Sequence, residues 1–145
     1  MTTTTITHFQ GEFRFLSNFW RAPVQIDGVT YPTAEHAYQA AKCVHASEAA
    51  RIATCYSPGQ AKRLGRIVTL RPDWEQVKID VMREVVQAKF TQNADLCRKL
   101  LATSDSELIE GNDWGDTYWG VCGDRGLNHL GKLLMQLRSE LADVQ

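Results

Sequence analysis

Three polar side chains with complementary chemistry recur at helical spacing near residue 35. Glu35, Gln39 and Lys42 stand at i, i+4 and i+7, so a helix would place an acid, an amide and a base on one face. A carboxylate and an amine held together could serve acid–base or nucleophilic chemistry. The same pattern also fits an ordinary solvated helix face with a weak ion pair. The three residues alone leave both interpretations open.

A second group of candidate residues lies in the last third of the chain. The segment 112–120 is dense in acids, aromatic residues and glycines, a mixture that suits a site better than a core. Three glycines between residues 120 and 126 then precede a leucine-rich helix. Such a loop can present backbone N–H groups to a phosphate, helped here by Arg125, although a plain flexible turn is the alternative. Asn128 would cap the helix in the second case and bind a ligand in the first.

The cysteines indicate neither a metal site nor a nucleophile. Cys43, Cys55, Cys97 and Cys122 show no C-x-x-C spacing, which predicts reduced, mostly buried thiols. Cys43 and His45 form the only neighbouring Cys/His pair, which is too few ligands for a zinc site. No cysteine lies in an obviously electropositive loop that would activate its thiol. We therefore expect no metal and no cofactor.

Turn and cap residues predict the elements that would position Glu35. Asp27-Gly28, between two short apolar runs, is typical of the two-residue turn of a β-hairpin. Pro32 and Thr33 then mark the start of a helix. Before the hairpin, residues 13–20 partly alternate aromatic and polar side chains, which predicts a strand or an extended segment running into a turn. Asn18 is the polar exception there, and it either bonds to the backbone of the turn or faces a pocket.

Most of the chain after residue 46 is predicted to be helical. Caps, periodic apolar residues and stop signals predict a helix from Ser47, one from Ser57-Pro58 to Gly65, a long one after Asp73, a short one after Asn93, a strand at 107–111 and a final helix through Leu130 and Leu141. Lys89, on the long helix, is expected to be solvated or to extend its amine to the surface.

Length and composition indicate one globular domain. The chain has 145 residues, of which 43% are hydrophobic and 23% charged, enough to bury a core. We expect a frayed N-terminal tail over residues 1–12 and a single domain over residues 13–145. The net charge of −1 argues against a general nucleic-acid or membrane-surface binder. No apolar run approaches the roughly 20 residues of a membrane span and no signal-peptide pattern opens the chain, which predicts a cytoplasmic protein.

Several separated motifs are distributed along nearly the whole chain. They are Phe15-Leu16-Ser17-Asn18-Phe19, Tyr31-Pro32-Thr33-Ala34-Glu35-His36 with Gln39 and Lys42, Ala88-Lys89-Phe90, Leu108-Ile109-Glu110, Asp116-Thr117-Tyr118-Trp119-Gly120 and Gly126-Leu127-Asn128-His129-Leu130-Gly131. In this order they resemble the motifs of the NADAR family, also called YbiA-like. The resemblance covers about residues 13 to 141.

The resemblance implies a compact, mainly helical α+β fold with a small β-hairpin or sheet, and hydrolysis of an N-glycosidic bond to ribose. It makes Glu35 the catalytic carboxylate. The further catalytic candidates are Lys42 and Asp116, and the substrate-binding candidates are Asn18, Phe19, His36, Gln39, Trp119, Gly120, Arg125 and Asn128. Asp113, in an inserted-looking stretch before Asp116, is the alternative counterpart of that acid.

These residue types fit cleavage of a C1′–N bond. Positive charge builds on the sugar ring, so Glu35 near C1′ would stabilise the transition state and orient or deprotonate the attacking water. The departing amine needs a proton, for which Asp116 and Lys42 are candidates. Alternatively, Lys42 attacks C1′ and forms a Schiff base, which requires a pKa lowered by burial or neighbouring positive charge. Trp119 would stack on the base or ribose, and Arg125 would meet a phosphate.

The resemblance leaves three functional hypotheses. The favoured substrates are ribosylamino phosphate intermediates of early riboflavin biosynthesis. The first alternative is removal of ADP-ribose from guanine in nucleic acid, which predicts a basic groove; the candidate residues are Arg14, Arg21, Lys62, Arg63 and Arg66. The second alternative is a non-catalytic module that binds ADP-ribose or a related nucleotide, and such a module would not need the Glu35 carboxylate near the ribose.

Overall fold

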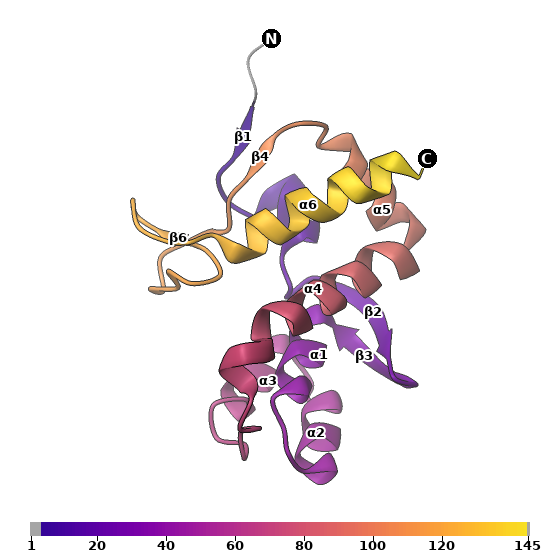
Figure 1. Ribbon diagram of the computed structural model, residues 1–145, viewed down its shortest axis with the longest axis vertical. Coiled ribbons are helices and arrows are strands. Elements are labelled where there is room, and N and C mark those ends of the chain that lie inside the picture. The colour runs from indigo at the N-terminus through magenta and orange to yellow at the C-terminus, as the bar shows by residue number, and fades with distance from the viewer. Residues whose placement is uncertain (1–3, 145) are drawn as a thin grey trace. The chain divides into compact units, whose positions relative to one another are not determined.

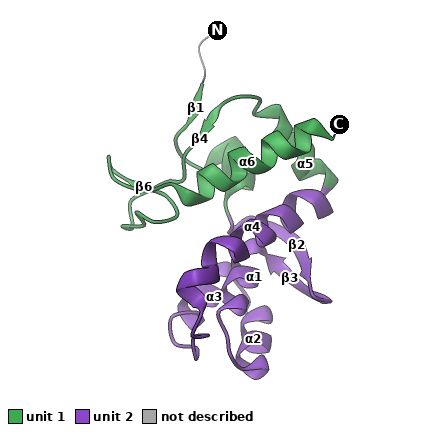
Figure 2. Ribbon diagram, viewed as in Figure 1, with its two compact units in different colours: residues 1–17, 94–145 green, residues 18–93 purple. Residues whose placement is uncertain are grey.

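Helices predominate in the computed structural model, which describes residues 4–144 (Figure 1). The strands within these residues are short and pair into two-stranded sheets. The chain divides into two compact units: Asn18–Asn93 is one, and Met1–Ser17 with Ala94–Gln145 is the other (Figure 2). The predicted mainly helical α+β class is confirmed, whereas the single domain over residues 13–145 stays a prediction.

The unit of residues 18–93 consists of a β-hairpin followed by helices. Its elements are β2 (Arg21–Ile26), β3 (Val29–Thr33), α1 (Ala34–Ala41), α2 (Ala46–Ala53), α3 (Pro58–Leu64) and α4 (Trp74–Gln92). The two strands are antiparallel, and Ile26 pairs with Val29 across the turn. Asp27 and Gly28 have φ values of 52° and 81°, and two positive values are what this type of hairpin turn requires. The hairpin predicted from this dipeptide is confirmed.

Thr33 joins the hairpin directly to α1. It is the last residue of β3, and its hydroxyl oxygen accepts the N–H of His36 over 3.2 Å. This bond satisfies one of the free donors at the start of the helix. Pro32 precedes it in the strand, where it removes no helical hydrogen bond. The helix start predicted from these residues is confirmed.

Small side chains let α1 pack against several elements of its unit. Ala37 packs with Val85 of α4, in a buried cluster that also includes the hairpin. Ala40 belongs to a second cluster with Ile52 of α2 and Ala61 of α3. Alanine methyl groups allow neighbouring backbones to approach closely, and larger side chains there would overpack both clusters. α1 is therefore the helix around which this unit is packed.

The predicted cap residue is confirmed for α3 but not for α4. α3 begins at Pro58 and ends before Gly65, and the Ser57 side chain caps its start. Asp73 precedes α4 as predicted, but its carboxylate does not cap the helix. It pairs with Arg71 instead, with Nε and Oδ1 2.6 Å apart.

The other unit combines short strands with helices. Its described elements are β1 (Thr5–Ile6), the 3₁₀ helix η1 (Gly11–Leu16), α5 (Ala94–Ala102), β4 (Glu107–Leu108), β5 (Gly111–Asn112), β6 (Val121–Cys122) and α6 (His129–Asp143). β1 pairs in parallel with β4, and β5 pairs in parallel with β6. The strand predicted at 107–111 is therefore divided between two sheets.

The N-terminal part differs from the sequence-based expectation in two ways. Residues 13–16 belong to η1 rather than to an extended segment. Phe15 and Leu16 are both buried, and consecutive residues of a strand would point to opposite faces. Thr5 and Ile6 lie within the predicted frayed tail but form β1 by pairing with residues far along the chain. Residues 1–3 of that tail lie outside the described residues.

Lys89 is fully buried, so the expectation that it is solvated is wrong. Burial lowers the pKa of its ammonium group from 10.5 to about 7. The sequence does carry a signal for this position. Lys89 follows Met82 by seven residues and Val85 by four, which places it on the buried face of α4.

The charge state of Lys89 predicts how stability depends on pH. Above about pH 7 the folded protein releases this proton, whereas the unfolded chain keeps it up to an ordinary lysine pKa. The unfolded state then binds more protons, so the free energy of unfolding rises with pH, by up to about 1.4 kcal/mol per unit. We expect urea unfolding at about pH 7 and about pH 8.5 to show this rise in the wild type and not in Lys89→Met.

Lys132→Met, which changes an exposed lysine, is the control and should keep the full rise. The window ends near pH 8.5 because burial raises the pKa values of Cys43 and Tyr31, and their titration would reduce stability at higher pH. An equal rise in Lys89→Met and in the wild type would contradict the prediction.

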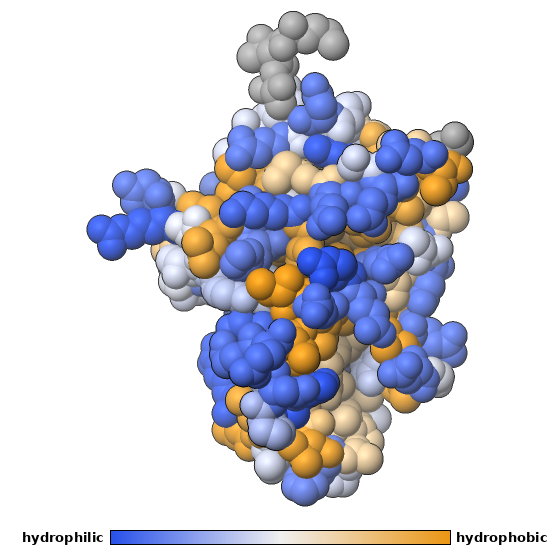
Figure 3. All heavy atoms as spheres, in the orientation of Figure 1, coloured by the Kyte–Doolittle hydropathy of each residue, from blue (hydrophilic) through white to orange (hydrophobic). Residues whose placement is uncertain are grey.

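Hydrophilic residues dominate the face shown in Figure 3, and apolar residues are interspersed among them. The four cysteines are free thiols, and all are half-buried rather than mostly buried as expected. Among residues 4–144, every helix is too short or too polar to cross a lipid bilayer.

Candidate functional site

The predicted polar face of α1 is buried. Glu35 is 8% exposed and Gln39 is 4% exposed, and every residue from 34 to 40 is buried. The alternative of an ordinary solvated face is therefore wrong. A carboxylate that is taken out of water needs compensating polar contacts.

Gln39 provides such a contact for Glu35. The two residues are one helical turn apart, and Gln39 Nε2 donates a hydrogen bond to Glu35 Oε2 over 2.6 Å. The backbone N–H of Glu35 donates to the carbonyl of Asn18 over 3.0 Å. Glu35 also lies in the first turn of α1, where the helix dipole favours negative charge. Because an accepting oxygen suits the ionised form, this geometry favours a carboxylate over a carboxylic acid.

Lys42 follows α1 as its C-terminal cap residue and is half-buried. Its Nζ lies 5.6 Å from the ring centre of Tyr38 and 6.0 Å from that of Trp74. Burial lowers the pKa of Lys42, the Glu35 carboxylate raises it, and Arg66 lowers it further. Overall the pKa of Lys42 is lowered, as a nucleophilic amine requires.

His36 has protein partners at both ring nitrogens. Because a carbonyl can only accept, Nε2 donates to the carbonyl of Cys55 over 3.0 Å. Nδ1 then accepts from the Thr33 hydroxyl over 2.7 Å, as in the neutral ring. Burial lowers the pKa of His36, with a smaller contribution from Arg21 that acts in the same direction. The fully buried ring anchors α1 to the chain around residue 55, and its predicted contact with substrate stays a prediction.

Asn18 and Phe19 precede β2 in the same unit. The Asn18 side chain is buried, and its Nδ2 donates to the sulfur of Met82 over 3.3 Å rather than to turn backbone. Its Oδ1 has no hydrogen-bond partner among the described residues. Phe19 is 38% exposed, and Lys62 Nζ lies 5.9 Å from its ring centre.

Three of the five basic residues singled out by the sequence lie near these side chains. They are Arg21, Lys62 and Arg66. Lys62 and Arg66 both lower the pKa of Lys42, and Arg21 lowers that of His36. The other two are Arg63, which is exposed on α3, and Arg14, which belongs to η1 in the other unit.

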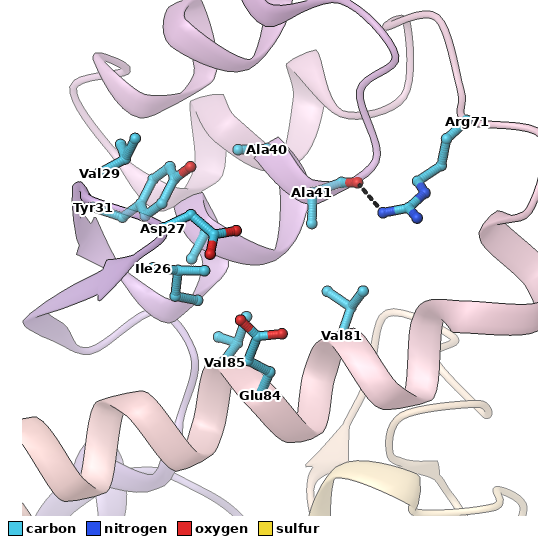
Figure 4. Close-up of a pocket in the computed structure, with 11 residues that line it drawn as sticks. Ile26, Asp27, Val29, Tyr31, Ala40, Ala41, Arg71, Val81, Glu84 and Val85 are labelled. Atoms are coloured by element: carbon cyan, nitrogen blue, oxygen red, sulfur yellow. Dashed lines mark hydrogen bonds between the residues drawn. The ribbon is translucent and has the colours of Figure 1, made fainter.

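A pocket of about 230 Å³ opens on a different face of α1 (Figure 4). Ala37, Ala40 and Ala41 line it, and these positions point away from the Glu35 face because helical residues turn by about 100° each. Asp27 and Glu84 contribute carboxylates to this pocket from the hairpin and α4. It contains none of the predicted catalytic residues.

In the other unit, Asn112 and Asp116 organise the acidic and aromatic loop. The Asn112 side chain accepts the Asp116 N–H over 3.0 Å and donates to the Asp116 carbonyl over 2.9 Å. Asp116 Oδ1 in turn accepts the N–H groups of Tyr118 and Trp119, over 3.1 and 2.9 Å. Asp113 is exposed. Of the two candidate acids, Asp116 is the one that is built into the loop.

Trp119 and Gly120 lie immediately after this turn. The Trp119 ring is half-buried and meets Tyr118 edge-on, with ring centres 4.8 Å apart. Gly120 is buried, and a Cβ at this position would overlap the side chain and the carbonyl of Glu110. Glycine is therefore required here by close packing.

The backbone N–H groups at the start of α6 are used within the protein. Residues 127, 128, 129 and 130 donate to the carbonyls of residues 117, 120, 118 and 119. These four N–H groups are therefore not available to bind a phosphate. The preceding segment forms a turn, which two backbone hydrogen bonds between Cys122 and Arg125 close. The Arg125 side chain is exposed.

Asn128 holds the N-cap position of α6 with φ 54°, but its side chain makes no capping bond. Its Oδ1 accepts the N–H of Glu110 over 3.0 Å, and its Nδ2 donates to the carbonyl of Leu108 over 2.9 Å. The predicted side-chain cap is therefore wrong. The amide ties α6 to the β4 segment, and a contact with ligand stays a prediction.

Sequence reasoning missed two residues that matter near these sites. Lys89 was visible from its helical spacing, as described above. Gly65 was interpreted only as a helix stop, and no sequence signal indicates that it packs on Gln39. Within the described part of the chain, no three His, Cys, Asp or Glu side chains are grouped so that they could hold a metal ion.

Comparison with known proteins adds independent information. The model of the NADAR domain matches residues 6–142. The N-glycosidase YbiA of Escherichia coli (strain K12) is 45% identical over 129 residues, which cover 87% of this chain and 80% of that protein. The N-glycosidase Npun_R5314 of Nostoc punctiforme is 43% identical over 134 residues, covering 88% of this chain and 85% of that protein.

Two further similarities concern a longer protein and a solved structure. The riboflavin biosynthesis protein VVA0006 of Vibrio vulnificus is 39% identical over 132 residues, covering 89% of this chain and 36% of that protein. The NMR structure of the Escherichia coli protein YbiA matches with a TM-score of 0.90 and 41% identity, covering 99% of this chain and 88% of that one.

The helical α+β fold and these relatives define an enzyme of the N-glycosidase class, a hydrolase acting on N-glycosyl compounds. The chain belongs to the NADAR family. The family and the enzyme class expected from the motifs are confirmed.

The packing of Gly120 predicts a stability effect. Gly120→Ala should lower the free energy of unfolding by about 1–3 kcal/mol, because the added methyl group meets Glu110 backbone that cannot move aside easily. Chemical denaturation measures the change. Gly59→Ala is the control, since its Cβ would meet only side-chain atoms at 3.8 Å. Equal stabilities of the two variants would contradict the argument.

Proposed function

We propose that the protein hydrolyses the C1′–N bond between a ribose phosphate and an amino-pyrimidine, and that ribosylamino phosphate intermediates of riboflavin biosynthesis are its substrates. The buried Glu35 carboxylate, hydrogen-bonded by Gln39, is the observation that carries the proposal. The relatives named as N-glycosidases support the bond type. The relative named as a riboflavin biosynthesis protein supports the substrate class.

The proposed reaction uses Glu35 as an ionised carboxylate. As the C1′–N bond breaks, its electron pair leaves with the amine and positive charge develops on the ribose ring. Glu35 stabilises this charge and accepts a proton from the water that attacks C1′. The products are ribose 5-phosphate and the free aminopyrimidine.

Lys42 is the proposed proton donor to the departing amine. A lysine whose pKa is lowered gives up its proton more readily near neutral pH, and burial acts on Lys42 in that direction. After each turnover Glu35 releases the proton that it accepted and Lys42 regains one, so the net reaction consumes one water molecule. The same lowered pKa favours the second mechanism, in which the neutral amine attacks C1′, the aminopyrimidine leaves, and a Schiff base forms with the opened sugar. Water then hydrolyses the Schiff base and frees the lysine.

The substrate phosphate is assigned to the basic residues near α1. Arg21, Lys62 and Arg66 supply positive charge there, whereas the N–H groups at the start of α6 already have protein partners. The family motifs also assign roles to residues of the other unit, and these roles remain predictions. They are Asp116 as an acid, Trp119 and Gly120 as pocket residues, and Arg125 and Asn128 as ligand contacts.

Removal of ADP-ribose from guanine in nucleic acid is the second candidate function. The same three basic residues favour it, because a nucleic-acid backbone would add phosphates to the substrate. A non-catalytic ADP-ribose reader is a weaker candidate. A reader gains nothing from a buried carboxylate, whose negative charge would oppose that of the ligand's phosphates.

Removing the Glu35 charge tests the proposed function. Glu35→Gln should lower kcat for ribosylaminopyrimidine phosphate by about 10²- to 10⁴-fold, because the amide neither stabilises the ring charge nor accepts the water proton. Released ribose 5-phosphate is the measurement. Glu84→Gln, which changes an exposed carboxylate of the same unit, is the control and should retain activity.

Parallel assays with ADP-ribosylated guanine DNA separate the candidate functions. Release of ADP-ribose from this DNA, without turnover of the small molecule, would favour the second function. Tight binding of ADP-ribose without turnover of either substrate would favour the reader. Unchanged rates in Glu35→Gln would remove Glu35 from the mechanism.

Lys42 variants distinguish its two proposed roles. If Lys42 donates a proton, Lys42→Arg should lower kcat by roughly 10²-fold with little change in KM, because a guanidinium does not give up its proton. Borohydride added during turnover should then trap no covalent adduct. A trapped adduct that disappears in Lys42→Ala and persists in Lys132→Ala would establish the Schiff-base route instead.

A further inference from the structure

Gly65, at the end of α3, packs directly against the side chain of Gln39. It is buried, and its backbone (φ −60°, ψ −18°) lies in the right-handed helical region that any residue adopts. Backbone conformation therefore does not require glycine. An added Cβ would overlap Gln39 Oε1 and lie 2.7 Å from its Cδ and 3.3 Å from its Cβ. The close approach of Gln39 is what requires glycine at this position.

The orientation of the Gln39 amide serves Glu35 rather than the amide itself. Nε2 donates to Glu35 Oε2, whereas Oε1 is buried without a hydrogen-bond partner among the described residues. Buried amides ordinarily satisfy both ends, so an unsatisfied acceptor indicates that another interaction sets the orientation. A rotated amide would bring Oε1 against the carboxylate, and two acceptors would repel each other.

Gln39 has several rotatable bonds, and helical spacing alone does not select this rotamer. Because Gly65 has no side chain, it leaves room for the Oε1 and Cδ atoms of Gln39. The next residue, Arg66, lowers the pKa of Lys42. The segment after α3 therefore affects the surroundings of both proposed catalytic residues, Glu35 and Lys42.

We propose that Gly65 is a positioning residue, which backs the Gln39 amide and thereby holds the Glu35 carboxylate in its productive orientation. Gly65 touches no reacting atom and acts only through Gln39. The inference rests on the proposed function, because its catalytic consequence depends on Glu35.

Gly65→Ala tests the proposal, with Gly59→Ala on the same helix as the matched control. The control methyl group would make only ordinary contacts at 3.8 Å. We expect Gly65→Ala to lower kcat for ribosylaminopyrimidine phosphate by about 10- to 100-fold with little change in KM, as displacement of a reacting group does. Gly59→Ala should keep wild-type kcat.

A double-mutant cycle separates positioning from a general packing effect. Gln39→Ala removes the amide that the new methyl group would displace, so Gly65→Ala should cause no further loss of kcat in that background. Losses that add would overturn the proposal. If Gly65→Ala alone does not fold, Gln39→Ala should restore folding in the double variant, and failure to restore it would equally overturn the proposal.

An NMR titration of the Glu35 carboxyl group tests the positioning without any enzyme assay. Its midpoint should move to higher pH in both Gly65→Ala and Gln39→Ala, because the ionised form loses a hydrogen-bond donor. The side chains of Lys42, Lys62 and Arg66 are common to all variants. An unmoved midpoint in Gly65→Ala would contradict the positioning role, whereas absent turnover by the wild type would contradict only the proposed function.

Discussion

Burial of one carboxylate is the constraint on which the unit of residues 18–93 depends. Glu35 is 8% exposed, and an ionised group in that position is stable only with compensating partners. The Gln39 amide, the start of α1 and the positive charge of Lys42 supply them. All three belong to α1 or directly follow it, so they move with the helix. The direction in which the carboxylate points therefore depends on how α1 is fixed within its unit.

The packing around α1 provides that fixation. Alanines on its other faces bring α2, α3 and α4 close, and Thr33 ties its first turn to the hairpin. His36 adds a bond from its ring to the carbonyl of Cys55. Gly65 completes the arrangement by allowing α3 to approach Gln39. Residues with no chemistry of their own thus determine where the catalytic candidate points.

Polar side chains of the other unit form hydrogen bonds to the backbone of its loops. Asp116 holds the backbone of residues 118 and 119, and Asn128 ties α6 to the strand region before it. Both residues belong to the family motifs, from which Asp116 was predicted as a catalytic acid and Asn128 as a ligand contact. Each side chain also makes hydrogen bonds to backbone groups. This structural role by itself accounts for an acid or an amide at the position.

The sequence by itself determined several local elements and the family. The Asp27-Gly28 turn, the start of α1 at Thr33 and the α3 boundaries at Ser57 and Gly65 follow from φ preferences and caps, which are properties of a few adjacent residues. Spacing also put Glu35 and Gln39 on one face. Only the tertiary structure decided that this face is buried, that Lys89 is enclosed, that residues 5 and 6 form a strand, and that Gly65 meets Gln39. These outcomes depend on contacts between distant segments, and local propensity carries no information about which segments will meet.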